Sequence, residues 1–237
     1  MEDLNFSRIL WIAGAYTLVI TGLYLFGYWG RFGLNVLEYI GVGDIVSHAL
    51  MPILATIATT ILGLAIGMVA AHGAPGGGAD TIIGRFSRTH WRPLVILDLV
   101  AMGFLARFGR EPVQWFLIVV LTMPLGDLLT HHDFFIAQMP NPLVRARLLN
   151  LSLGLAALFF AIGRVQAGEV LDGKGSLFVD VAGSGLELKS DASHPVSYVG
   201  HVADFFVVYD SANSQVVFLN AQKIKSLALI RNPKAAF

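Results

Sequence analysis

The sequence predicts an α-helical transmembrane bundle followed by a small all-β domain, either a sheet or a barrel-like fold. Two observations lead to this fold class. Hydrophobic residues make up 55% of the chain and charged residues 14%, with a mean hydropathy of +0.68, which leaves little charge to cover a soluble domain. The long apolar runs stop near Gly168, and a polar, alternating sequence follows. We therefore expect a membrane domain at residues 1–167 and an extramembrane domain at residues 168–237.

Five apolar stretches in the first domain are candidates for membrane spans. A helix needs about 20 apolar residues to cross the hydrocarbon core. The stretches that approach this length are residues 9–28, 45–71, 93–108, 113–129 and 148–165. The third is the shortest. Only Gly109–Pro112 separates it from the fourth, which indicates a tight helical hairpin.

The distribution of arginines over the short loops predicts the orientation, because cytoplasmic loops carry the excess of basic residues. With the N-terminus in the cytoplasm, the cytoplasmic segments hold six arginines and the outer segments hold three. Five spans then place the C-terminal domain in the periplasm of a bacterial inner-membrane protein. If residues 93–108 do not cross, the domain lies in the cytoplasm instead.

The C-terminal domain has the two-residue period of β-strands. Leu177, Val179 and Val181 alternate with other residues, and a last strand is expected around residues 224–229. Between them, β-branched and aromatic residues gather at 196–199, 205–209 and 216–219. Asp210–Asn213, which lies between the last two runs, is expected to form a hairpin turn.

Two acidic residues of the membrane domain are functional candidates, because charge inside or beside a span is costly. Asp98 lies in the middle of the apolar run Leu94–Gly103. It could form an ion or proton site or half of a buried ion pair, or it could simply hydrogen-bond another helix or sit near water. Glu38 lies in a mixed segment that does not require it, so it could pair with Arg31 or line a pore mouth.

Two further acidic residues have a histidine four positions later. Asp44 directly precedes the second span and is interpreted as a helix cap, although Asp44 and His48 could form a pH-sensitive pair. Asp127 and His131 would share one face of a continued helix, and imidazole with carboxylate suits zinc. We expect that helix to end near Thr130 and no second ligand cluster is present, so a polar helix end is the favoured interpretation and a metal site the alternative.

Gly63 and Gly67 form a GxxxG pattern within the second span. Small residues let helices approach closely, so the pattern predicts either packing within the chain or assembly into a homo-oligomer. The chain has no cysteine and no net charge, and it lacks a long basic block. These features predict no cofactor and argue against nucleic acid as a partner.

Two segments resemble uncharacterised bacterial polytopic inner-membrane proteins with a small C-terminal β-domain. In residues 28–40 (YWGRFGLNVLEYI), followed by Asp44 and Ile45, an aromatic-rich segment leads to an acidic residue that opens the second helix. Residues 163–173 (GRVQAGEVLDG), followed by residues 198–201 (YVGH), are similar to the way such proteins enter their β-domain. The resemblance implies this architecture and no activity.

The sequence favours a non-enzymatic inner-membrane protein that works as a homo-oligomer. It would be a sensor or a channel-like subunit that couples the β-domain to the helices, with the lipid bilayer as its partner. A membrane-embedded metal-dependent hydrolase is the alternative, and it requires Asp98, Asp127 and His131 to converge in one protomer. A scaffold for a protein partner is a third possibility, and it requires no such convergence.

Overall fold

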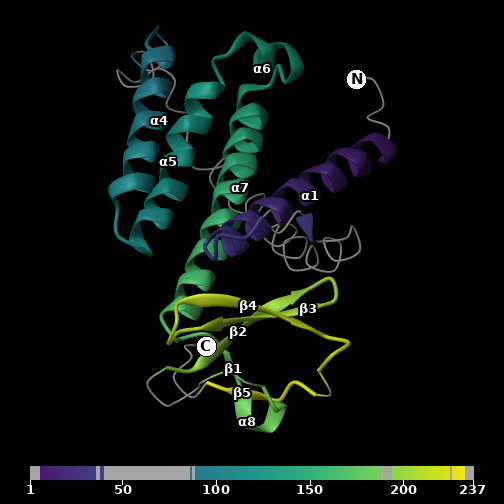
Figure 1. Cartoon of the computed structure of the whole chain (residues 1–237). Helices are drawn as coiled ribbons and strands as arrows, with labels where there is room; N and C mark the ends of the chain where they lie inside the picture. The colour runs from purple at the N-terminus through teal and green to yellow at the C-terminus, as the bar shows by residue number, and fades with distance from the viewer. Residues whose placement is uncertain are drawn as a thin grey trace. The chain divides into compact units, whose positions relative to one another are not determined.

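The computed structural model describes residues 6–35, 38–39, 86, 89–186, 188, 194–224 and 226–232. In these residues a helical region is followed by a small five-stranded antiparallel sheet (Figure 1), as the sequence predicts. The helices are α1 (Phe6–Gly30), α4 (Trp91–Phe108), α5 (Val113–Leu129), α6 (Asp133–Gln138), α7 (Pro142–Leu171) and α8 (Val181–Ser184). The strands are β1 (Leu177–Val179), β2 (Val196–Val202), β3 (Phe205–Asp210), β4 (Gln215–Asn220) and β5 (Leu229–Arg231).

The expected number of five membrane spans is corrected by the structure. In the described part of the chain, one helix is long and apolar enough to cross a membrane, namely Val144–Leu171 within α7. Helix α4 is not apolar enough to meet this description, because its 18 residues include Arg92, Asp98 and Arg107. Helix α5 is apolar but has only 17 residues. The expected first span, residues 9–28, falls within α1, and residues 45–71 lie outside the described residues.

The predicted helical hairpin is present between α4 and α5, which pack against each other. The segment 113–129 coincides with α5, and α4 begins two residues before the predicted start. Gly109 makes the tight connection possible. A Cβ atom at this position would lie 2.5 Å from the Gln114 Cβ atom and 2.6 Å from the Leu105 carbonyl oxygen.

The chain forms two compact units, and their boundary does not follow residue 168. One unit comprises Met1–Ile20 and Ala49–Ala161, and the other comprises Thr21–His48 and Ile162–Phe237. The second unit therefore includes the C-terminal turns of α1 and α7 in addition to the sheet. The expected division into residues 1–167 and 168–237 stays a prediction.

The sheet of the second unit is open, with strand order β4-β3-β2-β1-β5 and antiparallel pairing throughout. The edge strands β4 and β5 rule out the barrel alternative. The predicted turn after β3 is also present. The Asp210 carboxylate accepts hydrogen bonds from the Ala212 N–H at 3.0 Å and from the Asn213 side chain at 2.8 Å.

Each face of the sheet has an apolar cluster, because successive residues of a strand point to opposite faces. Val207 and Val208, which are neighbours on β3, are both fully buried but belong to different clusters. The Val207 cluster includes Leu25 and Trp29 of α1 and Val170 of α7. The helical turns of the second unit thus cover one face of the sheet.

Helix α1 ends in a Schellman motif that fixes the position of its last turn. The Leu34 N–H donates to the Trp29 carbonyl at 3.2 Å, and the Gly33 N–H donates to the Gly30 carbonyl at 3.2 Å. Gly33 has a φ of +72°, in the left-handed region where glycine carries no Cβ penalty. Leu34 packs on the cluster that contains Trp29, which is the apolar contact typical of this motif.

Candidate functional site

The second unit contains a cavity of about 370 Å³, a size found for small-molecule sites. Its walls come from three distant parts of the sequence: residues 24–29 of α1, residues 166–170 of α7 with the following loop 174–176, and residues 199–201 of β2. The cavity therefore depends on how the helix ends and the strand are brought together.

Gly163 lets α1 and α7 approach each other beside the cavity. A Cβ atom on Gly163 would lie 2.9 Å from the Tyr28 nitrogen and closer still to the Tyr24 carbonyl oxygen. The two backbones are therefore in contact, an approach that small residues permit. Ala167, one turn further along α7, is completely buried. Across this crossing the Tyr24 hydroxyl donates to Gln166 Oε1 at 2.8 Å.

The α1 wall of the cavity is aromatic. The Tyr24 and Tyr28 rings are stacked, with their centroids 6.3 Å apart. The Tyr28 and Trp29 rings meet edge to face at 5.5 Å. The Tyr28 hydroxyl donates to the Val199 carbonyl oxygen of β2 at 2.7 Å. This bond satisfies a polar group in an apolar setting and ties the helix to the strand.

A β-bulge in β2 shapes the opposite wall. The register between β2 and β3 shifts between Tyr198 and Gly200, so Val199 has no partner residue on β3. The Val199 carbonyl can then accept the bond from Tyr28. A Cβ atom on Gly200 would lie 3.1 and 3.2 Å from two carbons of the Trp29 ring. A glycine at this position therefore leaves room for the indole.

Besides the tyrosines, the acidic and basic side chains that line the cavity are Glu169, Lys174 and His201. All three residues are exposed to solvent. The Lys174 ammonium nitrogen lies 3.7 Å from the Asp172 carboxylate, and both side chains are about two-thirds exposed (66% and 67%). Such an exposed pair contributes little energy. Lys174 is therefore able to interact with another acidic group.

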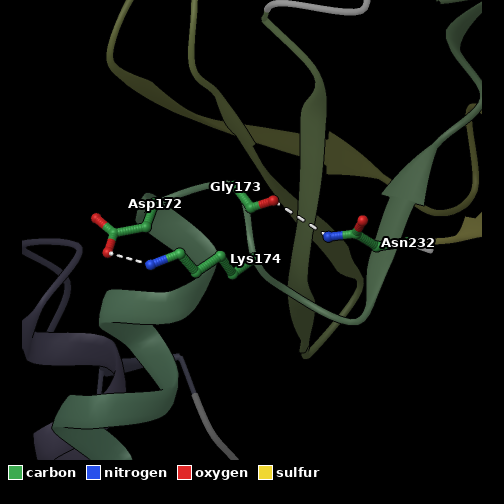
Figure 2. A network of polar contacts seen from close by, with 4 residues as sticks. All are labelled: Asp172, Gly173, Lys174 and Asn232. Carbon is green, nitrogen blue, oxygen red and sulfur yellow. Dashed lines mark hydrogen bonds and ion pairs between the residues drawn. The ribbon is translucent and has the colours of Figure 1, made fainter. Parts of the chain in front are cut away.

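The loop between α7 and β1 is held by Asn232, which directly follows β5 (Figure 2). The Asn232 side chain, only 2% exposed, donates to the Gly173 carbonyl at 3.1 Å and to the Gly175 carbonyl at 2.8 Å. Its backbone N–H donates to the Ser176 carbonyl at 2.9 Å. One side chain thus fixes the loop that forms the third wall.

The same loop ends α7 with a second Schellman motif. The Lys174 N–H donates to the Glu169 carbonyl at 2.7 Å, and the Gly173 N–H donates to the Val170 carbonyl at 3.1 Å. Gly173 has a φ of +69°. As a result, Glu169 and Lys174, five residues apart, are both fixed at the end of α7.

Asp98 lies on the face of α4 that is partly buried. Leu94, Ala101 and Leu105, which recur at helical spacing, are partly buried, whereas Leu97 and Leu99 on either side of Asp98 are 64% and 51% exposed. One carboxylate oxygen of Asp98 is buried and has no hydrogen-bond partner among the described residues. Asp98 therefore lies on the partly buried side of α4, and no described residue donates a hydrogen bond to that oxygen.

Asp127 and His131 do not share a helical face, because α5 ends at Leu129 as the sequence suggested. The Asp127 carboxylate accepts a hydrogen bond from the Asn150 side chain of α7 at 2.8 Å. His132, which directly follows His131, caps α6, because its side chain accepts a hydrogen bond from the Phe134 N–H at 3.2 Å. The structure has no group of three or more His, Asp or Glu side chains that could hold a metal ion within its described ranges.

The remaining candidates contribute little to a site. Glu38 accepts a local hydrogen bond from the Asn35 side chain at 2.7 Å. Four other candidates lie outside the described residues: Asp44, His48, Gly63 and Gly67.

Sequence reasoning missed the cavity. Tyr24, Tyr28 and Trp29 lie at the end of the first expected span, where aromatic residues are ordinary at a membrane interface and do not indicate a cavity. The pair Gly163 and Ala167, two small residues four positions apart on α7, is the signal that could have indicated the helix crossing. Comparisons of the chain with known protein families, with curated proteins and with solved structures gave no match.

Proposed function

We propose that this chain is a bacterial inner-membrane sensor. Its helical unit is embedded in the bilayer, and its sheet-containing unit, outside the hydrocarbon core, binds a small ligand in the cavity. We also propose that the chain assembles into a homo-oligomer. The observation that carries the sensing role is that the last turns of both α1 and α7 form walls of the same cavity.

The apolar surface of α4 and α5 supports the membrane location. Large apolar side chains on these helices are 44% to 65% exposed. They are Ile96, Leu97, Leu99, Val100, Phe104, Phe108, Val113, Phe116, Leu117, Val120 and Met123. Soluble proteins rarely expose apolar surface of this extent. A bilayer covers it without loss of backbone hydrogen bonds, because helices satisfy these internally.

The ends of α4 also fit a membrane interface. Its 18 residues correspond to about 27 Å of helix, close to the thickness of the hydrocarbon core. At one end the Arg92 guanidinium lies 5.4 Å from the Trp91 ring, and at the other Arg107 lies 5.3 Å from the Phe108 ring. Arginine and aromatic side chains extend to the headgroup level in this way. Asp98 is the one acidic residue of this helix.

Helix α7 gives independent support. Only 28% of its most apolar 18-residue window is buried. A core helix of a soluble protein would be mostly buried over such a window. The exposed apolar surface of α7 therefore needs another cover, and acyl chains are a suitable one.

A ligand in the cavity would act on two helices at once. Helix α1 begins at Phe6 and α7 at Pro142, both in the first unit, and both helices continue into the second unit. A ligand that prefers one arrangement of the crossing at Gly163 would shift the population toward that arrangement. This is the physical basis of the proposed coupling.

Cysteine accessibility tests the membrane location, because the chain contains no native cysteine. Val100→Cys on α4 and Val120→Cys on α5 should resist a membrane-impermeant maleimide in proteoliposomes. Asp204→Cys, at an exposed turn between β2 and β3, is the matched control and should react readily. If Val100→Cys and Val120→Cys react as fast as Asp204→Cys, these helices are not embedded.

A channel-like subunit is a second candidate, favoured by the buried carboxylate oxygen of Asp98 that no described residue satisfies. A carboxylate on the protein-facing side of an otherwise apolar helix is typical of an ion or proton path. Asp98→Asn should then fold normally and abolish the conductance of the protein in planar bilayers. An unchanged conductance, or no conductance in the unmodified protein, would exclude this role.

A further inference from the structure

We propose that the cavity of the second unit binds a zwitterionic small molecule. Its ammonium group would lie at the aromatic wall near Glu169, and its acidic group, a phosphate or a carboxylate, would face Lys174 and His201. This inference rests on the proposed function, because it names the ligand class of the same sensing cavity.

Several groups of α1 and α7 that line the cavity suit a cation. The faces of Tyr24, Tyr28 and Trp29 carry negative electrostatic potential and attract an ammonium group within about 6 Å of a ring centroid. The Glu169 carboxylate lines the same cavity. Both helices also contribute their last turns, where the macrodipole is negative. These three contributions have the same sign.

Two side chains from the loop and β2 that line the cavity, Lys174 and His201, suit an anion. Within the described ranges, Lys174 forms one ion pair, the weak and exposed contact with Asp172 at 3.7 Å. The His201 ring lies against Phe206, with centroids 5.1 Å apart, and the residue is exposed. An acidic group between Lys174 and His201 would accept charge-assisted hydrogen bonds, which are stronger than neutral ones.

Positively and negatively charged side chains line the same cavity, and this combination disfavours ligands that carry charge of only one sign. An anion alone would meet Glu169, and a cation alone would meet Lys174. In each case one charged side chain would lose water without gaining a partner, which costs binding energy. A molecule with both charges a few bonds apart satisfies both ends. Leu25, Val170 and Val199 offer apolar contact to the chain between them.

Two sources supply this chemistry. Free zwitterions such as phosphoethanolamine carry an ammonium and a phosphate group, and so does the headgroup of a phosphatidylethanolamine lipid. The recognised chemistry is the same, so the inference concerns the charge pair, and the experiment must separate the sources.

Titration calorimetry on the full-length protein in phosphatidylglycerol nanodiscs tests the inference with phosphoethanolamine as the probe. Methyl phosphate and ethylamine serve as ligands of a single charge. Phosphoethanolamine should bind saturably and about tenfold or more tightly than either of them. Repeating the titration in phosphatidylethanolamine nanodiscs separates the sources. A weaker apparent affinity there indicates competition by the lipid headgroup, and an equal affinity indicates a free zwitterion as the ligand.

Two variants test the assigned ends of the cavity. Glu169→Gln should weaken phosphoethanolamine binding about tenfold while leaving methyl phosphate binding no weaker, because it removes the partner of the ammonium group. Lys174→Met should weaken both ligands. Lys223→Met, an exposed lysine that does not line the cavity, is the control and should bind as the unmodified protein does. Circular dichroism establishes that all three variants fold.

The inference is overturned if phosphoethanolamine does not bind in phosphatidylglycerol nanodiscs, or binds no tighter than methyl phosphate. Unchanged affinity in both folded cavity variants would also overturn it. Neither result affects the maleimide experiment, which reports the membrane location without any ligand. A failed titration with protected Val100→Cys therefore contradicts the ligand class alone, and reactive Val100→Cys contradicts the membrane location alone.

Discussion

The hydroxyl group of Tyr28 makes a hydrogen bond between residues that are 171 positions apart in the sequence. The bond joins the last turn of α1 to the bulge of β2 at 2.7 Å, and the bulge leaves the Val199 carbonyl available to accept it. A single side chain therefore connects two walls of the cavity. Removing the hydroxyl group should therefore affect the second unit without changing the apolar area that the Tyr28 ring buries.

Tyr28→Phe should lower the free energy of unfolding of the protein by about 0.5–1.5 kcal/mol, the net value of one such hydrogen bond. Tyr209→Phe is the matched control. Tyr209 packs on the same apolar cluster, and no hydrogen bond of its hydroxyl is present among the described residues. Urea unfolding in detergent measures both variants. Equal losses in the two would mean that the Tyr28 bond contributes nothing of its own.

Asn232 is the residue that holds the loop wall of the cavity. Asn232→Ala removes two donors to the Gly173 and Gly175 carbonyls. Buried carbonyl groups that lose a donor cost about 1–3 kcal/mol. We expect a loss of stability in this range and weaker ligand binding. Asn213→Ala, which removes one local turn bond to Asp210, is the control and should leave ligand binding unchanged. Faster proteolysis at residues 173–176 in Asn232→Ala, but not in Asn213→Ala, would show that the loss of stability arises in this loop.

At the scale of elements, the crossing of α1 and α7 positions the cavity. The sequence predicts both helices well, because a long apolar run with few charges has a clear signature. The two-residue period also predicts β2, β3 and β4, but the last strand is Leu229–Arg231 rather than residues 224–229, and Val181 begins helix α8 instead of continuing β1. The crossing is not predictable in the same way, because it depends on a contact between residues 24–28 and Gly163, which are distant in the chain.

The small-residue pattern that drew attention was Gly63 and Gly67, which lie outside the described residues. Gly163 and Ala167 have the same spacing, with the charged Arg164 and the polar Gln166 between them. Asp98 is conspicuous in the sequence because its neighbours are apolar. The cavity residues Glu169 and Lys174 are not conspicuous, because charges beside a helix end are ordinary in a sequence.

Gly163→Ala should destabilise the protein, because its Cβ atom would lie too close to the α1 backbone. Overpacking of this kind costs typically about 1–3 kcal/mol. Gly22→Ala on α1 is the matched control. No atom lies within 4 Å of the Cβ position at Gly22, so the higher helix propensity of alanine should be neutral or stabilising by up to about 1 kcal/mol. Thermal unfolding in detergent compares the two, and equal behaviour would argue against a tight crossing.

At the scale of the whole molecule, the side of the membrane on which the chain ends depends on whether the number of crossings is odd or even. Helices α4 and α5 have 18 and 17 residues and are joined by four residues. Such a hairpin crosses twice or not at all, so it does not change the side of the segments that follow. The correction from five spans to fewer therefore need not change the predicted topology.

The remaining crossings decide the outcome. A chain that crosses only with α7 ends on the side opposite its N-terminus, and so does one that crosses three or five times. Counted for five crossings, the arginines of the short loops favour a cytoplasmic N-terminus by six to three. We therefore expect the second unit in the periplasm, where small zwitterions from outside the cell would reach its cavity.

Reporter fusions after Phe237 test this topology. A reporter that is active only in the periplasm should be active there, and one that is active only in the cytoplasm should be silent. Fusion of the same reporters before Met1 provides the opposite pair of readings and controls for expression. If the cytoplasmic reporter is active at both ends, the number of crossings is even. The ligand of the second unit would then have to be a cytoplasmic molecule or an inner-leaflet headgroup, because the cavity lies entirely within that unit.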